Sequence, residues 1–110
     1  MAEKHEKMVS DYKKILIKKK YIIINKSPII YRYRPDIYAT KSNNELFVEV
    51  EIEQTIHNDH TLEQLSTLYE YLMKNKHSKG CLVVPKKTKS HADFLIRTTF
   101  GDDKITVDVI

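Results

Sequence analysis

The sequence has little of several residue types, and each shortage excludes a class of protein. It has one cysteine, Cys81, which rules out an internal disulfide framework and fits a reducing compartment, so we expect a cytoplasmic protein. It has two glycines, Gly80 and Gly101, so no glycine-rich loop is present to cradle a nucleotide phosphate. No apolar run approaches the ~18 residues that a membrane-spanning helix needs, so we expect no membrane partner.

The length and charge of the chain are those of one globular domain. Of its 110 residues, 41% are hydrophobic and 31% are charged, and we expect a single domain over residues 1–110. The net charge of +4 is too small to establish a nucleic-acid partner. Acids concentrate in residues 45–53, whereas basic residues form runs that include Lys13, Lys14, Arg32, Arg34, Lys86 and Lys87. Two explanations stay open: a basic frame around an acidic phosphodiesterase centre, or ordinary solvated helix ends and loops.

The hydrophobic pattern predicts an α/β domain with the order helix, three strands, helix, strand, helix and strand around a mixed sheet. We expect Asp59 or Thr61 to cap the second helix, Gly80 to end it, and Phe94 and Leu95 of the third helix to face the core. Helices are predicted over residues 3–20, 61–77 and 90–100. Extended segments are predicted over residues 21–24, 29–33, 34–40, 45–53, 81–84 and 105–110.

The segments 34–40 and 45–53 are predicted to form a β-hairpin, because both alternate and a polar Lys-Ser-Asn-Asn turn joins them. If Thr40 faces Glu45, antiparallel pairing places Asp36 opposite Glu49. Directly opposed residues point to the same side with Cβ atoms roughly 4.5–5.5 Å apart. Glu51 lies on that side too, and the same register places Arg34 opposite it.

Two carboxylates so placed are suited to a divalent cation. Mg²⁺ or Mn²⁺ is held by one or two carboxylates together with water and substrate oxygens, and Asp36 and Glu49 supply that set. The backbone carbonyl of Val50 is a further candidate ligand. A bound cation would lower the pKa of a water and neutralise charge on a phosphate.

An ordinary explanation of the same pattern is a half-exposed strand, in which glutamates face solvent and the alternate apolar residues face the core. Asp36 argues against it, because a surface strand would favour a lysine opposite Glu49. Tyr38 and Phe47 on the same side also indicate that this face is partly covered.

These residues resemble the PD-(D/E)XK nuclease superfamily, which includes restriction enzymes and archaeal-type Holliday-junction resolvases. The matching pieces are Pro35-Asp36, Glu49-Val50-Glu51 after a hairpin, then an amphipathic helix and an apolar strand. The element order over residues 3–85 is similar to that superfamily's core. The resemblance implies a restriction-endonuclease-like core followed by a C-terminal helix and strand. It also implies a Mg²⁺- or Mn²⁺-dependent endodeoxyribonuclease that binds DNA and often works as a homodimer.

The resemblance assigns Asp36 and Glu49 to the two metal-binding acids. The family's usual third residue is a lysine that positions the attacking water, whereas this chain has Glu51. Three explanations stay open. Some restriction enzymes work with an acid there; a lysine from elsewhere, such as the helix over 61–77, would replace it; or catalysis is lost, which leaves a module that binds nucleic acid or regulates a partner.

The resemblance also suggests two helical residues for the site. Many members carry a glutamate on the first helix, for which Glu6 is the candidate, although it lies off the apolar stripe of Met8, Tyr12 and Leu16. Gln64 resembles a polar residue that some members aim at the metal. For both residues, an exposed position on the helix is the alternative.

The run Tyr31-Arg32-Tyr33-Arg34 interleaves rings with positive charge. Arginine binds phosphates and tyrosine stacks on unpaired bases, so the run is typical of a nucleic-acid contact. An amphipathic strand with arginines reaching to solvent explains it equally well. His57 and His60 are interpreted as loop residues, since two histidines three apart without a cysteine pair are weak evidence for a metal.

Overall fold

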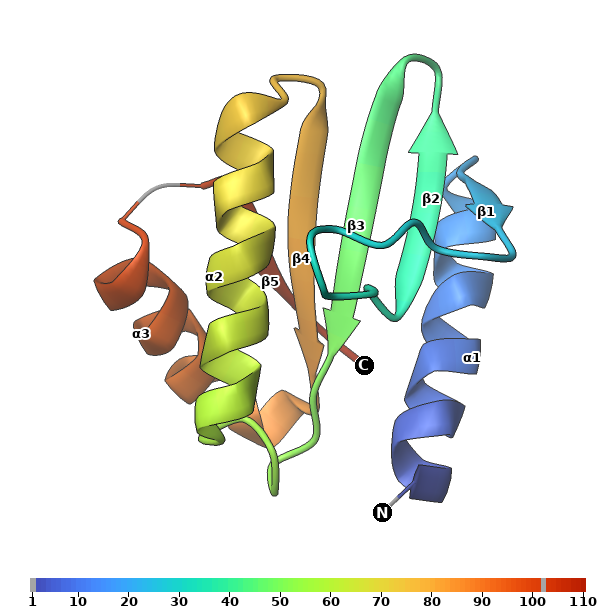
Figure 1. Ribbon diagram of the computed structural model, residues 1–110. Coiled ribbons are helices and arrows are strands. Elements are labelled where there is room, and N and C mark those ends of the chain that lie inside the picture. The colour runs from blue at the N-terminus through green and yellow to red at the C-terminus, as the bar shows by residue number, and fades with distance from the viewer. Residues whose placement is uncertain (1, 102) are drawn as a thin grey trace.

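The computed structural model describes residues 2–101 and 103–110 and shows an α/β fold (Figure 1). Its five-stranded mixed sheet has the order β1-β2-β3-β4-β5, in which β1, β2 and β3 pair antiparallel and β3, β4 and β5 pair parallel. The strands are β1 (Ile22–Ile24), β2 (Ile37–Lys41), β3 (Asn44–Val50), β4 (Ser78–Val84) and β5 (Ile105–Val109). The helices are α1 (Ala2–Lys18), α2 (Asp59–Lys74) and α3 (Lys89–Thr99), with a short 3₁₀ helix η1 (Lys86–Thr88) before α3.

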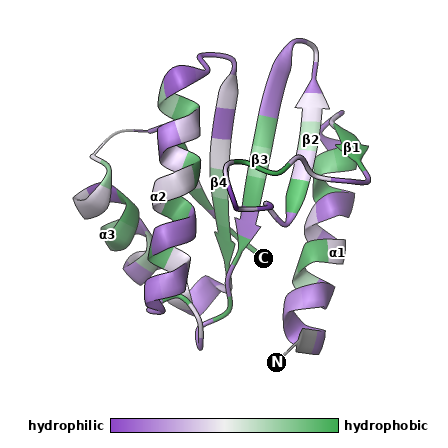
Figure 2. Ribbon diagram, viewed as in Figure 1, coloured by the Kyte–Doolittle hydropathy of each residue, from purple (hydrophilic) through white to green (hydrophobic). Residues whose placement is uncertain are grey.

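Two apolar clusters cover the two faces of the sheet. On one face, α1 packs its stripe of Met8, Tyr12 and Leu16 against a group that includes Val48 and Val50. On the other face, α2 and α3 pack against strand residues that include Phe47 and Leu82. The helices contribute Leu65, Leu68, Leu72, Ala92 and Ile96 to this cluster. In Figure 2, α1 and α2 change between hydrophobic and hydrophilic colours along their length, as expected of helices with one buried side.

Strand β3 is covered on both faces, and this decides between the two explanations of its glutamates. Every residue from Phe47 to Ile52 is buried, including Glu49 and Glu51. The half-exposed strand is therefore wrong for this end of β3. Its glutamates point into protein, where an ionised carboxylate is costly unless it is paired.

The hairpin has the predicted register. Thr40 pairs with Glu45 and Ile37 pairs with Val48. The turn is tighter than expected, because Lys41 also pairs with Asn44 and leaves a two-residue loop. Ser42 takes the left-handed conformation in that loop, with φ 57°.

The predicted strand over 29–33 is wrong. Ile30 and Tyr33 instead exchange backbone hydrogen bonds of 2.6 and 2.9 Å across a tight turn. Ile30 and Tyr33 pair directly across this turn, so their side chains lie on the same side, and both are buried in the core. The segment between β1 and β2 crosses the α2 side of β3, as Figure 1 shows.

Several helix boundaries also differ from expectation. Asn58, rather than Asp59 or Thr61, caps α2, and its side-chain oxygen accepts from the His60 amide at 2.9 Å. Gly80 does not end α2 but lies in β4. A Cβ at this position would stand 3.0–3.2 Å from side chains of α2 and β5, so a glycine fits the close packing there.

In α3, the prediction for Phe94 is wrong, since its side chain is 56% exposed. Ala92 and Ile96 face the core in its place, one helical turn apart. No helix in the described part of the chain is long and apolar enough to cross a membrane.

Candidate functional site

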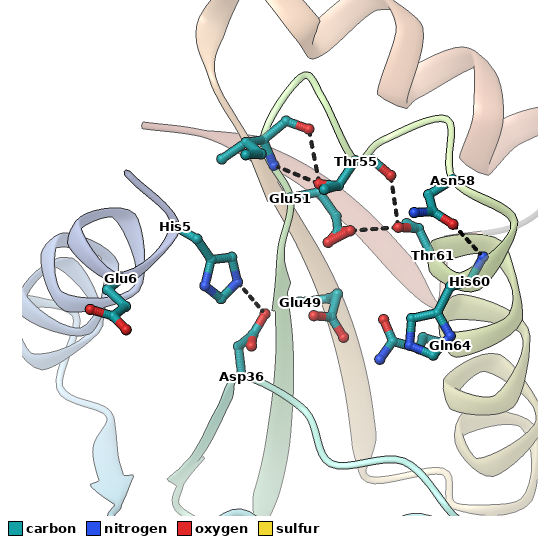
Figure 3. A pocket seen from close by; sticks show the side chains of 11 residues that line it. His5, Glu6, Asp36, Glu49, Glu51, Thr55, Asn58, His60, Thr61 and Gln64 are labelled. Atoms are coloured by element: carbon teal, nitrogen blue, oxygen red, sulfur yellow. Dashed lines mark hydrogen bonds and ion pairs between the residues drawn. The ribbon is translucent and has the colours of Figure 1, made fainter. Parts of the chain in front are cut away.

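A pocket of about 370 Å³ opens at the C-terminal end of β3. Four segments form it: the first turns of α1, the residue before β2, the end of β3 with the loop after it, and the first turns of α2. Figure 3 shows the side chains that line it. We call this pocket the acid pocket. The lining residues discussed below are His5, Glu6, Asp36, Glu49, Glu51, His60, Thr61 and Gln64.

Asp36 and Glu49 converge in this pocket, as the hairpin register predicts. They continue the β2–β3 pairing by one step beyond Ile37 and Val48, and Figure 3 shows their carboxyl groups near one another at the centre of the pocket. The Asp36 carboxylate accepts a hydrogen bond of 2.9 Å from the Val50 amide. Two acids from neighbouring segments of the hairpin thus enter one pocket.

Glu49 is buried without a cationic partner. Its residue is 4% exposed, and the Tyr33 hydroxyl donates a hydrogen bond to its carboxylate. Burial raises the pKa of Glu49 well above its usual range, the nearby Asp36 raises it further, and the bond from Tyr33 opposes both effects. No ion pair within the described chain includes Glu49. The Glu49 carboxylate therefore forms readily only if positive charge is brought to it.

Glu51 has a different partner from the one predicted. Arg34 is exposed and does not pair with it, because β2 begins only at Ile37 and the ladder does not reach residue 34. The Thr61 hydroxyl, in the first turn of α2, instead donates to Glu51 at 2.6 Å. Burial raises the pKa of Glu51, and the Thr61 bond acts in the opposite direction. Glu51 is thereby turned toward α2, as Figure 3 shows.

The three acids do not form a closed cage. Within the described residues, no group of three histidine, cysteine, aspartate or glutamate side chains stands ready to hold a metal ion. A hard cation does not require one, because Mg²⁺ keeps several waters and is held by one or two carboxylates. Asp36 and Glu49 meet that smaller requirement.

The Val50 carbonyl also fits an oxygen-ligand set. The amide and carbonyl of one strand residue point to the same edge, and the Val50 amide points to Asp36. The described β2–β3 ladder ends at Ile37 and Val48, so it does not include Val50. The Val50 carbonyl therefore points to the Asp36 side of β3, beyond the end of that ladder.

His5 is a site residue that the sequence interpretation missed. Its Nε2 lies 3.2 Å from an oxygen of Asp36. The signal was present, because His5 precedes Met8 by three residues and so continues the buried stripe of α1. Glu6, the residue that was predicted instead, lines the rim of the pocket and is exposed.

Gln64, in the second turn of α2, lines the pocket and is half-buried. A catalytic lysine from α2 is not available there. The one lysine of α2 is Lys74, ten residues after Gln64 and so about 15 Å farther along the helix. Lys13 of α1 lies closer to Asp36 than Lys74 does, since Lys13 and Asp36 line a small cavity together on the α1 side.

The predicted basic residues are distributed around the pocket in different ways. Lys13 lies beside Asp36, whereas Lys14 is exposed on α1. Arg32 and Arg34 line a cavity next to the pocket. Lys86 and Lys87 follow β4. Because β3 and β4 are parallel, their C-terminal ends lie at the same end of the sheet. Lys87 forms an ion pair of 2.9 Å with Glu53.

The opposite end of β3 carries a contrasting acid, Glu45. Hydroxyl groups of Tyr38, Tyr71 and Ser78 donate to its carboxylate at 2.6, 3.3 and 2.6 Å. Although partial burial raises the pKa of Glu45, these three hydrogen bonds bring it below its usual value. This carboxylate is stabilised by the chain itself.

Other candidate residues carry no chemistry in this structure. Cys81 is buried, and burial raises the pKa of its thiol, so it is a poor nucleophile. His57 lies in the loop before α2, with its ring 4.0 Å from that of His91 between centroids. The chemistry of the acid pocket must be inferred from its own residues, because no protein-family model, curated protein or solved structure matches this chain.

Proposed function

We propose that this protein is a Mg²⁺- or Mn²⁺-dependent nuclease that hydrolyses phosphodiester bonds in DNA. The observation that carries the proposal is the pair Asp36 and Glu49: adjacent carboxylates, one of them 4% exposed, with no lysine or arginine paired to them in the described chain. Such a pair is expensive to maintain for stability alone, and perturbed acids in a pocket are typical of functional sites.

The proposed fold family is the restriction-endonuclease-like, or PD-(D/E)XK, superfamily. Support comes from the order helix, antiparallel strands, helix and parallel strand, with both acids on the central hairpin. A homodimer is part of the proposal, since members that cut two strands commonly act in pairs.

The roles of the residues follow from their contacts. Asp36, Glu49 and the Val50 carbonyl would hold the cation, which supplies Lewis acidity and a water of lowered pKa when bound. His5 orients Asp36, and Tyr33 orients Glu49. Glu51, held by Thr61 and with a raised pKa, is suited to accept a proton from the attacking water.

A second candidate function is a nuclease-fold module that binds nucleic acid or regulates a partner without cutting. Glu51 favours it, because it occupies the family's lysine position and is already bonded to Thr61. None of the described residues lining the acid pocket is a lysine.

Cleavage of supercoiled plasmid in Mg²⁺, in Mn²⁺ and in EDTA tests the proposal. Asp36→Asn and Glu49→Gln should each reduce metal-dependent cleavage by about 100-fold or more, since each removes a ligand charge worth several kcal/mol. Glu70→Gln is the matched control, because Glu70 is exposed and paired only with Lys74. Binding without cleavage by the wild type in either metal would establish the second function. Cleavage that survives both substitutions would refute the acid pocket as the active site.

A further inference from the structure

A second cavity adjoins the acid pocket and has a volume of about 480 Å³, which is in the range of ligand sites. Its walls come from the turn before β2 and from the first half of α2. His60 and Gln64 line both cavities, so the two open side by side along α2. We call this second cavity the arginine groove, lined by Tyr31, Arg32, Tyr33, Arg34, His60, Glu63, Gln64 and Thr67.

The backbone holds Tyr31 in a conformation that is unusual for a bulky residue. Its φ of 59° is in the left-handed region, which disfavours large side chains. The hydrogen bonds between Ile30 and Tyr33, whose side chains are buried, fix the turn on both sides of it. The Tyr31 ring is nevertheless 55% exposed. Strain of this kind persists where the surroundings impose it, and it often marks a binding position.

Positive charge surrounds this exposed ring. Arg32 and Arg34 are exposed, and neither takes part in an ion pair among the residues described. The Lys74 ammonium lies 6.0 Å from the centre of the Tyr31 ring. Among the described residues, Glu63 is the one carboxylate in the wall of the groove. Because residues 30–33 form a turn and Arg34 lies in no strand, the amphipathic-strand explanation of this run does not apply.

From this geometry we propose that the arginine groove binds an unpaired segment of DNA beside the acid pocket. One base stacks on Tyr31, and the flanking phosphates contact Arg32 and Arg34. The inference rests on the proposed nuclease function, because it names the substrate class of that site: a single strand, a flap or the unpaired part of a junction.

Duplex DNA fits these residues less well. In a duplex each base is stacked between its neighbours, and its faces are hidden from a protein ring. An unpaired base offers a free π-face, and stacking on an aromatic side chain contributes about 1–3 kcal/mol per base. Guanidinium groups bind phosphates with paired hydrogen bonds, which suits a backbone that bends around one ring.

Fluorescence anisotropy in EDTA separates binding from cleavage. The probes are a fluorescein-labelled oligothymidylate of roughly 15 nucleotides and a duplex of the same length. Tyr31→Asn removes the ring while keeping a residue that tolerates the left-handed region, and Tyr31→Phe keeps the ring. Arg32→Gln removes one phosphate contact. Arg97→Gln on the far helix α3 is the matched control, because Arg97 lines a different cavity.

The wild type should bind the single strand at least about fivefold more tightly than the duplex. Tyr31→Asn should remove that preference, and Tyr31→Phe should keep it. Arg32→Gln should weaken binding of the single strand and reduce its dependence on salt, while Arg97→Gln changes neither. Thermal melting of each variant establishes that it is folded.

Equal or tighter binding of the duplex would overturn the inference, as would an unchanged single-strand affinity in folded Tyr31→Asn. The two proposals fail separately. Single-strand binding that depends on Tyr31, without metal-dependent cleavage, refutes the nuclease and keeps the groove as the binding site. Metal-dependent cleavage that does not respond to Tyr31→Asn keeps the nuclease and refutes the groove.

Discussion

Glu49→Gln, which removes the charge of the buried acid but nearly keeps its shape, should change how stability depends on pH. The pKa of Glu49 is raised in the folded protein, so between its unfolded and folded pKa values the native state holds a proton that the unfolded state has lost. Stability from this group is complete below the unfolded pKa and falls as pH rises toward the folded pKa. Metal-free wild type should therefore lose stability from about pH 5 upward.

The size of the effect follows from one proton. Within that window the free energy of unfolding falls by up to about 1.4 kcal/mol per pH unit. For a domain of this length, that corresponds to roughly 5–10 °C in melting temperature per unit. Glu49→Gln lacks this contribution and should become more stable relative to wild type as pH rises. Glu51, whose pKa is also raised, leaves a smaller slope of the same sign in the variant.

Thermal melting in EDTA from pH 5 to pH 8 measures these slopes, with Glu70→Gln as the surface control. At a hundredfold excess over Kd, Mn²⁺ should stabilise the wild type at pH 8 by about 2.7 kcal/mol and so raise its melting temperature, and it should have little effect on Glu49→Gln. Equal slopes for wild type and Glu49→Gln would refute the reasoning about the buried charge. Equal Mn²⁺ effects would refute the assignment of Glu49 as a ligand.

Three further substitutions test individual contacts. Tyr33→Phe removes the donor to Glu49 and should destabilise by about 1–3 kcal/mol, more at pH 8 than at pH 5, as measured by urea unfolding. Thr61→Val should cost a similar amount, since its hydroxyl bonds Glu51, and should lower any metal-dependent cleavage in the plasmid assay. Gly80→Ala should destabilise by about 1–3 kcal/mol in the same unfolding assay without changing metal affinity, because the added methyl would stand 3.0–3.2 Å from core side chains.

The hairpin and its two acids were predictable because the information is local. Alternation with period two and a polar turn fix a register, and one correct pair, Thr40 with Glu45, then determines all others. The convergence of Asp36 and Glu49 follows from the same arithmetic. His5 was predictable too, since it lies three residues before Met8 on the buried side of α1.

The hairpin predicted partial cover of the acids, through Tyr38 and Phe47, but not which residues complete their burial. Alternating glutamates look alike whether their face meets water or protein, and here α2 and Tyr33, in the turn before β2, contribute the cover. That turn was predicted as a strand, because its residues favour extended structure and only tertiary packing of Ile30 and Tyr33 bends it. In α3 the core selects Ala92 over the larger Phe94, which composition alone does not reveal.

Strand β3 carries two glutamates in opposite circumstances. At one end three hydroxyl groups donate to Glu45, so this fold stabilises that carboxylate with its own side chains. Four residues later it provides Glu49 with one donor and a second acid. A single substitution such as Glu49→Gln would remove the buried charge. The cation of the proposed function would bring to Glu49 the positive charge that the described part of the chain does not place there.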